Sequence, residues 1–259
     1  MRPVCNPSER RHFVLNIVVP MAGLGSRFAQ VGFERPKPLI SVRGRPMIQQ
    51  VIENVRPVED HRFIFVVLDE HRGKFALDQE LTTMAPGCTV VSVPELTGGA
   101  AMTVLAARHL IDAPEPLLIA NSDQMVLPDN RAFISHSLSS GLDGVILTMP
   151  ADDPKWSFVG LDATGLVTRV VEKEVISNIA TVGIYYFALG QDFVRAADAM
   201  IAAGDEVNGE YYVAPVYNYQ IAAGGKVGTF DAGSEGKTVW GLGRRADMCR
   251  FLGFAPATP

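Results

Sequence analysis

The side chains best suited to chemistry in this chain follow a glycine-rich turn near its amino terminus. The run VVPMAGLGSR (residues 18–27) precedes the run RPKPL (residues 35–39), which contains Lys37. Glycines let backbone N–H groups approach an anion closely, because no side chain blocks the approach. Arg27 and Lys37 add the positive charge that several phosphates require. This segment therefore predicts a site for a phosphorylated ligand.

Two common phosphate-binding loops do not fit the chain. A dinucleotide-binding fingerprint needs a third glycine three residues after Gly25, where this chain has Phe28, and this disfavours a Rossmann dehydrogenase. A Walker A loop could end at the Gly-Lys-Thr of residues 236–238, but Asp231 stands where its first glycine belongs. Residues 236–238 are better explained as a hairpin turn.

The bulk composition indicates a globular enzyme. A chain of 259 residues, 47% hydrophobic and 20% charged, can bury a substantial core and does not resemble a disordered chain. The net charge of -5, without a long basic run, disfavours nucleic acid as a partner. No apolar run approaches the roughly 20 residues that span a membrane. Cys5, Cys88 and Cys249 lack the spacing of a metal site or a disulfide framework, which indicates a reducing cytoplasm.

The spacing of apolar residues predicts a Rossmann-like, doubly wound α/β sheet with a small antiparallel insertion. In the first half, strand patterns alternate with helical ones, which requires parallel crossovers and places ligands at the carboxyl ends of the strands. In the second half, successive strand patterns with a turn at residues 162–165 predict the antiparallel part. The expected strands are 14–19, 63–68, 89–93, 117–120, 144–149, 158–161, 167–171 and 181–187, and the expected helices are 46–54, 100–110, 191–203, 213–223 and 245–253.

The amino-terminal residues differ in composition from the rest of the chain. Residues 1–12 are polar and contain proline, so we expect a loose arm followed by one continuous domain over residues 13–259. Asn16 and Pro20 interrupt the apolar stretch of residues 13–25, which favours a buried first strand over a secretory signal.

The glycine-rich turn belongs to a longer pattern. The runs Gly-x-Gly-Ser-Arg and Pro-Lys-Pro-Leu, followed by GRPMI (residues 44–48), resemble the amino-terminal signature of the sugar-phosphate nucleotidyltransferases, or pyrophosphorylases. The resemblance touches residues 15 to 245. The run NGEYYV (residues 208–213) is similar to a capsule and polysaccharide-associated branch of that family. The resemblance implies a mixed, GT-A-like nucleotidyltransferase sheet.

The resemblance also implies how the nucleotide is held. Arg27 and Lys37 would hold and activate a triphosphate, and the run ELTGGAA (residues 95–101) would form a second nucleotide loop. Judged from its residues alone, that second run is equally a glycine-rich helix start. The nucleotide-binding residues implied are Ala22, Gly23, Gly25, Ser26, Glu95, Thr97, Gly98, Gly99, Ala100 and Ser122.

A carboxylate at the end of an apolar run is the candidate metal ligand. Residues 117–120 are apolar and lead to Asp123, which matches the metal-binding aspartate of the family. Such a residue is often only a turn or cap residue. Mg²⁺, however, prefers one or two carboxylates together with phosphate oxygens and water, which Asp123 can supply.

The acceptor side is assigned from the resemblance alone. The Glu172-Lys173 pair, otherwise an ordinary solvated pair, would contact the acceptor, with the lysine on its phosphate and in a catalytic role. The acceptor-binding residues implied are Trp156, Glu172, Lys173, Gly183, Asn208 and Glu210.

One position departs from the family pattern. A second metal-binding aspartate is expected after Trp240, but this chain has Gly241 there. Metal binding would then rest on Asp123 and phosphate oxygens, or Asp231 or Glu235 would substitute. The sequence leaves this open.

The function that these residues imply is transfer of a nucleotide from CTP, UTP or dTTP to a phosphorylated acceptor, with Mg²⁺ as cofactor and release of pyrophosphate. A sugar 1-phosphate destined for a surface polysaccharide is the preferred acceptor. A phosphate monoester is already anionic near neutral pH, so no general base is needed. We expect neither membrane nor nucleic acid as a partner, while a homo-oligomer stays open.

Three alternatives stay open at this point. A phosphocholine cytidylyltransferase would need an aromatic cage, for which Trp156, Tyr185, Tyr186 and Tyr211 are candidates. Because Tyr185 and Tyr186 alternate on a strand, only one of them can line a pocket. Other non-sugar phosphates, such as a phosphorylated polyol or amide, fit the same chemistry. A catalytically silent nucleotide-binding or scaffold protein is the alternative from another class.

Overall fold

The computed structural model describes residues 13–25, 28, 30 and 32–253. The expected arm at residues 1–12 lies outside the described residues, and so do Ser26 and Arg27. Within the described part, no helix is both long and apolar enough to cross a membrane.

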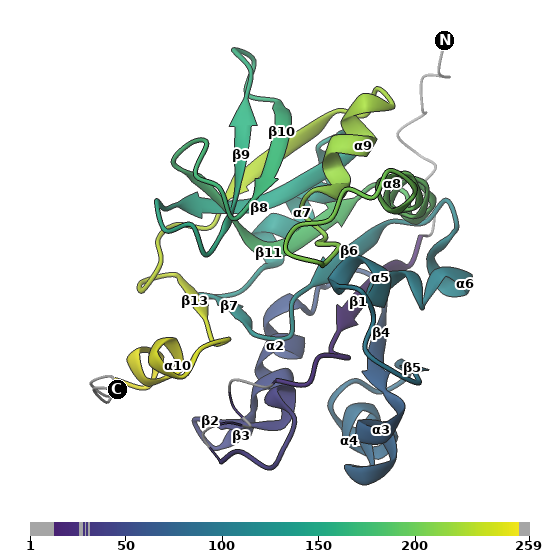
Figure 1. Ribbon diagram of the computed structural model, residues 1–259, viewed down its shortest axis with the longest axis vertical. Helices are drawn as coiled ribbons and strands as arrows, with labels where there is room; N and C mark the ends of the chain where they lie inside the picture. Colours follow the sequence, from purple (N-terminus) through teal and green to yellow (C-terminus); the bar gives the residue numbers. More distant parts are fainter. Residues whose placement is uncertain (1–12, 26–27, 29, 31, 254–259) are drawn as a thin grey trace.

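A nine-stranded mixed sheet forms the centre of the molecule, in the order β10-β9-β11-β6-β1-β4-β5, with β8 paired to β11 and β12 paired to β8 (Figure 1). Its parallel half consists of β1 (Leu15–Pro20), β4 (His61–Leu68), β5 (Thr89–Val93) and β6 (Leu117–Ala120). The strands β5 and β6 have the bounds that the sequence predicts. The Rossmann-like fold class is thereby confirmed.

Helices connect the parallel strands. These are α2 (Met47–Val55), α3 (Asp69–Lys74), α4 (Leu77–Met84), α5 (Ala100–Leu105) and α6 (Arg108–Ile111). The single helix expected at residues 100–110 is therefore divided in two. The amide of Ala106 is shared between the carbonyls of Met102 and Thr103, and that of Ala107 bonds Val104, a tightening that ends an α-helix.

The antiparallel half extends the same sheet. It contains β8 (Gly144–Pro150), β9 (Ser157–Leu161), β10 (Val167–Glu172) and β11 (Ile179–Phe187), and β12 (Val227–Asp231) joins β8 in parallel. The turn between β9 and β10 is closed by Asp162, whose carboxylate accepts hydrogen bonds from the amides of Thr164 and Leu166. The turn that the sequence predicts at residues 162–165 is thus present and is stabilised by the side chain of Asp162.

The remaining elements cover the sheet or border one end of it. They are the 3₁₀ helix η1 (Lys37–Leu39), the short strands β2 (Ser41–Val42), β3 (Arg45–Pro46), β7 (Gln124–Val126) and β13 (Val239–Gly241), and the helices α7 (Arg131–Ser139), α8 (Gly190–Ala202), α9 (Val216–Ala222) and α10 (Arg245–Phe251). The strand β7 pairs with β13 in antiparallel fashion.

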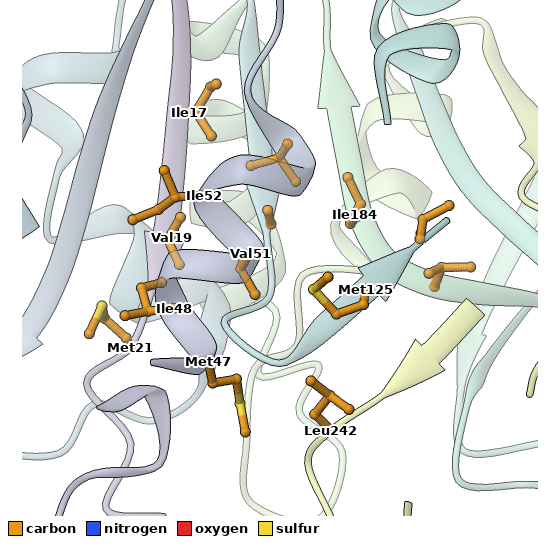
Figure 2. Packing of buried hydrophobic residues seen from close by; sticks show 14 of the residues in the cluster. Ile17, Val19, Met21, Met47, Ile48, Val51, Ile52, Met125, Ile184 and Leu242 are labelled. Carbon is orange, nitrogen blue, oxygen red and sulfur yellow. The ribbon is translucent and has the colours of Figure 1, made fainter. Parts of the chain in front are cut away.

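Two hydrophobic clusters pack on opposite faces of the sheet because side chains alternate along each strand. On β1, Ile17 and Val19 face one cluster and Val18 faces the other. Figure 2 shows the first cluster, where Ile48 and Ile52 of α2 pack against the β1 residues. Each such fully buried side chain contributes about 1.5–3 kcal/mol to folding. The second cluster is covered by α5, α8 and α9.

Candidate active site

A cavity of about 680 Å³ lies at the carboxyl ends of β1 and β6. Pro20 ends β1, and Asn121, Ser122 and Asp123 follow β6, so the sheet itself delivers them to the cavity wall. Gly183 of β11 lines the cavity from the antiparallel half. In open α/β sheets this edge is where ligands bind.

The central feature of the cavity is an ion pair. The Nζ of Lys37 lies 2.7 Å from the Oδ2 of Asp123, and the two side chains are 24% and 14% exposed. Lys37 begins η1, and a side-chain carbon added at Gly25 would lie only 3.1 Å from its Cβ. The glycine-rich turn therefore packs directly against Lys37.

The segment after β13 closes in on Asp123 from the other side. The amide of Leu242 donates to the carbonyl oxygen of Asp123 at 2.7 Å, and a Cβ at Gly243 would lie 2.5 Å from Oδ2. A side chain at Gly243 would thus occupy the space beside the carboxylate. This close approach leaves Asp123 between η1 and the β13 segment.

The residues present fit a Mg²⁺ ion that takes most of its ligands from elsewhere. No group of three or more His, Cys, Asp or Glu side chains gathers within the described residues. A single carboxylate at Asp123, with phosphate oxygens and water completing the shell, is a donor set that Mg²⁺ accepts.

The second charged pair is built by the end of β10. The Oγ of Ser157 donates to the carboxylate of Glu172. Burial raises the pKa of Glu172, which the hydrogen bond from Ser157 and the charge of Lys173 oppose and the charge of Glu210 reinforces. Glu172 and Lys173 line the same cavity as Lys37 and Asp123.

Lys173 is held in a strained conformation. Its φ of 56° lies in the left-handed region, which costs a non-glycine residue about 1–3 kcal/mol. Its amide donates to the carbonyl of Trp156 at 3.1 Å. Its Nζ bonds the hydroxyl of Tyr212 and lies 4.3 Å from the centroid of that ring. Such strain at a charged cavity residue is typical of a functional site.

Gly183 allows β11 to approach the end of β6. Its φ is 87°, and a Cβ there would lie 2.3 Å from the Nδ2 of Asn121. Its carbonyl accepts a hydrogen bond from the amide of Asn121 at 3.0 Å. A glycine is therefore required at this position by the backbone conformation and by the contact with Asn121; its predicted role in binding an acceptor stays a prediction.

The second glycine loop has a structural role of its own. The amide of Tyr211 donates to the carbonyl of Gly98 at 2.8 Å, and the carbonyl of Tyr211 accepts from the amide of Ala101 at 2.9 Å. A Cβ at Gly99 would lie 2.5 Å from the backbone of Tyr211. Close packing against the Tyr211 backbone therefore accounts for Gly99, whereas a Cβ at Gly98 would lie 2.7 Å from the Sδ of Met102.

The structure brings together part of the predicted site. Residues expected to bind the nucleotide, the metal or the acceptor come from segments far apart in the sequence. The predicted residues that line the cavity are Lys37, Ala100, Ser122, Asp123, Trp156, Glu172, Lys173 and Gly183. The described ones outside its lining are Ala22, Gly23, Gly25, Glu95, Thr97, Gly98, Gly99, Asn208 and Glu210, while Arg27 and Ser26 lie outside the described residues.

Gly241, which replaces the second metal-binding aspartate of the family pattern, lies close to two side chains. A Cβ at Gly241 would lie 3.4 Å from the Trp156 ring and 3.5 Å from the Oε1 of Gln124. Asp231 and Glu235, the two residues that could substitute for this aspartate, do not line the cavity. The carboxylate of Asp231 accepts from the amide of Gly233, and Glu235 pairs with Lys155 at 2.6 Å.

Several lining residues were missed by the sequence reasoning. They include Gln124, Lys155, Tyr212, Arg244 and Asp247. Tyr212 stands inside the run NGEYYV (residues 208–213), and Arg244 follows Gly241 by three positions. Lys155 directly precedes Trp156, and Gln124 directly follows Asp123. Their position next to predicted site residues is the signal that could have identified them.

Fold and cavity together define an α/β protein with a charged cavity at the strand ends, the edge at which open α/β sheets bind ligands. The chain matches the sequence profile of the Nucleotidyl transferase family over residues 17–206, and it belongs to that family.

The relatives that it resembles are longer. It is 30% identical over 246 residues to the bifunctional protein GlmU of Burkholderia orbicola, covering 92% of this chain and 51% of the relative. It is 31% identical over 248 residues to GlmU of Burkholderia ambifaria, again covering 92% and 51%. The chain thus spans about half the length of the curated relatives it matches.

Solved structures confirm the fold. The nucleoside-diphosphate-sugar pyrophosphorylase from Vibrio cholerae has a TM-score of 0.76 at 23% identity, with 92% of this chain and 99% of that chain covered. The inositol-1-phosphate CTP transferase from T. maritima has a TM-score of 0.68 at 15% identity, with 92% of each covered. The UTP-bound UGPase from Acinetobacter baumannii has a TM-score of 0.70 at 18% identity, with 93% of each covered.

Proposed function

We propose that this chain transfers a nucleoside monophosphate from a nucleoside triphosphate to a phosphorylated acceptor, a sugar 1-phosphate, and releases pyrophosphate. The observation that carries this proposal is one cavity with two charged pairs. Lys37 and Asp123 meet at 2.7 Å beside the glycine-rich turn, and Glu172, which ends β10, and Lys173, which follows it, line the same cavity. Two phosphorylated substrates need two such cationic positions.

The reaction needs positioning and charge neutralisation. An oxygen of the acceptor's phosphate attacks the α-phosphorus of the triphosphate in line, a new P–O bond forms, and the bond to the β-phosphate breaks with its electron pair leaving on pyrophosphate. Lys37 neutralises the triphosphate and Lys173 orients the attacking phosphate. The attacking oxygen is already anionic, so no side chain has to remove a proton. This fits the described cavity lining, which contains no histidine.

Asp123 is the residue that would hold Mg²⁺ in this proposal. The ion would supply positive charge to the phosphate oxygens. Asp123 already pairs with Lys37 at 2.7 Å, so the residue that would hold the ion lies beside the residue that would bind the triphosphate.

The cavity wall favours a hydroxyl-bearing acceptor. The Oγ1 of Thr181 lies 3.2 Å from the hydroxyl of Tyr185, and Ser157 bonds Glu172, so the wall offers several hydroxyls and a carboxylate to sugar hydroxyls. A polyol phosphate would use the same groups, and one structural neighbour is an inositol-1-phosphate CTP transferase. We keep a polyol phosphate as the second candidate.

The aromatic residues support a choline cage poorly. Tyr185 lines the cavity, whereas Tyr186 and Tyr211 do not. The Nζ of Lys155 lies 5.0 Å from the centroid of the Trp156 ring, and Lys173 lies over Tyr212 in the same way. A cation of the protein thus already lies over each of these two rings, where it would compete with a quaternary ammonium.

The cellular role in this proposal is synthesis of a surface polysaccharide precursor in the cytoplasm. Its support is the NGEYYV run of residues 208–213, which resembles the capsule-associated branch.

A pyrophosphate-release assay tests the proposal. Each of the four nucleoside triphosphates is combined with sugar 1-phosphates, a polyol phosphate and phosphocholine. We expect release only when one pyrimidine triphosphate and one hydroxyl-rich acceptor are both present. Triphosphate binding by calorimetry without turnover of any acceptor would instead support the silent binding or scaffold protein.

A further inference from the structure

Arg244 brings an additional positive charge to the Asp123 side of the cavity. It lines the cavity together with Lys37 and Asp123. It directly follows Gly243, whose missing side chain leaves the backbone against the carboxylate of Asp123. No role was predicted for Arg244 from the sequence.

The cavity-lining cations differ in whether they have a partner. Lys37 pairs with Asp123, Lys155 pairs with Glu235, and Lys173 bonds the hydroxyl of Tyr212. Within the described part of the chain, the guanidinium of Arg244 makes no hydrogen bond or ion pair. The nearby carboxylate of Asp247 lies 3.7 Å from Arg250 instead. Arg244 is therefore exposed and available to a ligand anion.

The backbone that carries Arg244 is anchored beside the Lys37 segment. The guanidinium of Arg43 lies 4.0 Å from the centroid of the Phe251 ring and donates to the Phe251 carbonyl at 2.8 Å. Arg43 stands between β2 and β3, which follow η1, and Figure 1 shows α10 beside this hairpin. Trp240 packs edge-on against the same ring, with 5.3 Å between centroids. Residues 240–251 are thus tied to the segment that positions Lys37.

We propose that Arg244 binds the β- and γ-phosphates of the triphosphate and the pyrophosphate that they become. This inference rests on the proposed nucleotidyl transfer. A guanidinium donates two parallel hydrogen bonds to phosphate oxygens, which an ammonium cannot do. When the bond to the α-phosphorus breaks, negative charge grows on the leaving pyrophosphate, and Arg244 neutralises it. Lys173, at the end of β10, serves the acceptor's phosphate instead.

The test compares Arg244→Ala with Arg245→Ala, a neighbouring exposed arginine that does not line the cavity. Calorimetry with inorganic pyrophosphate and Mg²⁺ measures binding directly. We expect Arg244→Ala to weaken pyrophosphate binding about tenfold or more, the loss of a charge-assisted hydrogen bond. Arg244→Lys should recover only part of it, and Arg245→Ala should bind like the unaltered chain.

Steady-state kinetics separates the two phosphate positions. Arg244→Ala should raise KM for the triphosphate while KM for the acceptor stays unchanged. Unchanged pyrophosphate binding in Arg244→Ala, or an effect on acceptor KM alone, would overturn the inference and leave the transferase proposal intact. If the unaltered chain itself neither binds pyrophosphate nor turns over, both fail together.

Discussion

Lys37 and Asp123 illustrate how single residues create the cavity's chemistry. They are 86 positions apart in sequence, yet their charged atoms meet at 2.7 Å. Each partially neutralises the other until a triphosphate supplies new partners for the lysine. At the next residue pair, Glu172 is half-buried with a raised pKa and Lys173 has a strained backbone, so this side of the cavity contains two unfavourable local states.

Removing either charge of the Lys37–Asp123 pair should strongly reduce turnover. We expect Lys37→Ala and Asp123→Ala each to lower kcat/KM by about 10²–10³-fold, the usual cost of a charge-stabilising group. Pyrophosphate release with the true substrates measures this. Lys226→Ala, which removes an exposed lysine outside the cavity, is the control and should turn over normally. Near-normal activity of both cavity variants would refute the assigned roles.

Glu172 should make stability depend on pH. Burial raises its pKa above the ordinary 4.5, so the native state holds this proton more tightly than the unfolded chain does. The contribution of Glu172 to the free energy of unfolding therefore falls as pH rises from about 4.5 through the folded pKa.

Urea denaturation of the unaltered chain and of Glu172→Gln at several pH values measures this effect. The unaltered chain should lose stability relative to Glu172→Gln as pH rises through that window. Glu206→Gln, at an exposed position, should show no such trend. A stability difference that stays constant with pH would show that Glu172 is not responsible.

Among the elements, short strands and tight approaches decide where the site residues lie. The sequence predicted the parallel strands well because apolar residues dominate each of them; residues 89–93 and 117–120 form strands at their predicted bounds. The strands β7 and β13 have three residues each and pair across more than a hundred positions of sequence. No local pattern of apolar residues therefore predicts this pairing. Asp123 and Gly241 are positioned by that pair.

Glycines at these approaches provide an element-scale prediction. Gly183→Ala forces a Cβ to within 2.3 Å of Asn121 and keeps a positive φ, whereas Gly165→Ala keeps a positive φ in open space. We expect Gly165→Ala to cost about 1–2 kcal/mol of folding free energy, and Gly183→Ala to cost more and to reduce activity. Chemical denaturation and the release assay check both. Equal costs for the two variants would contradict the close contact.

Across the whole molecule, the cavity is assembled from residues between Pro20 and Asp247. The sequence predicted the fold class and a set of cavity residues by resemblance, including Lys37, Asp123 and Lys173. It did not predict Arg244 and Asp247 as lining residues, because their placement depends on how α10 docks rather than on any local pattern. The anchor of that docking is Phe251, which is 4% exposed.

Phe251→Ala should therefore act on both stability and the site. Truncating a buried phenylalanine costs about 3–5 kcal/mol, and releasing α10 should weaken triphosphate binding through Arg244. Urea denaturation and calorimetry measure the two effects. Val58→Ala, at a position 84% exposed, should change stability by less than about 0.5 kcal/mol. Unchanged stability in Phe251→Ala would mean that α10 is not held in this way.

The central claim is that the groups around this cavity converge on one polyphosphate. A crystal structure with Mg²⁺, a nucleoside triphosphate made unreactive by a carbon bridge between its α- and β-phosphates, and the acceptor tests it most directly. We predict triphosphate oxygens within hydrogen-bonding distance of Lys37, the metal on Asp123, and the acceptor's phosphate at Lys173. A nucleotide bound elsewhere on the molecule, with these three side chains free of both substrates, would contradict the account.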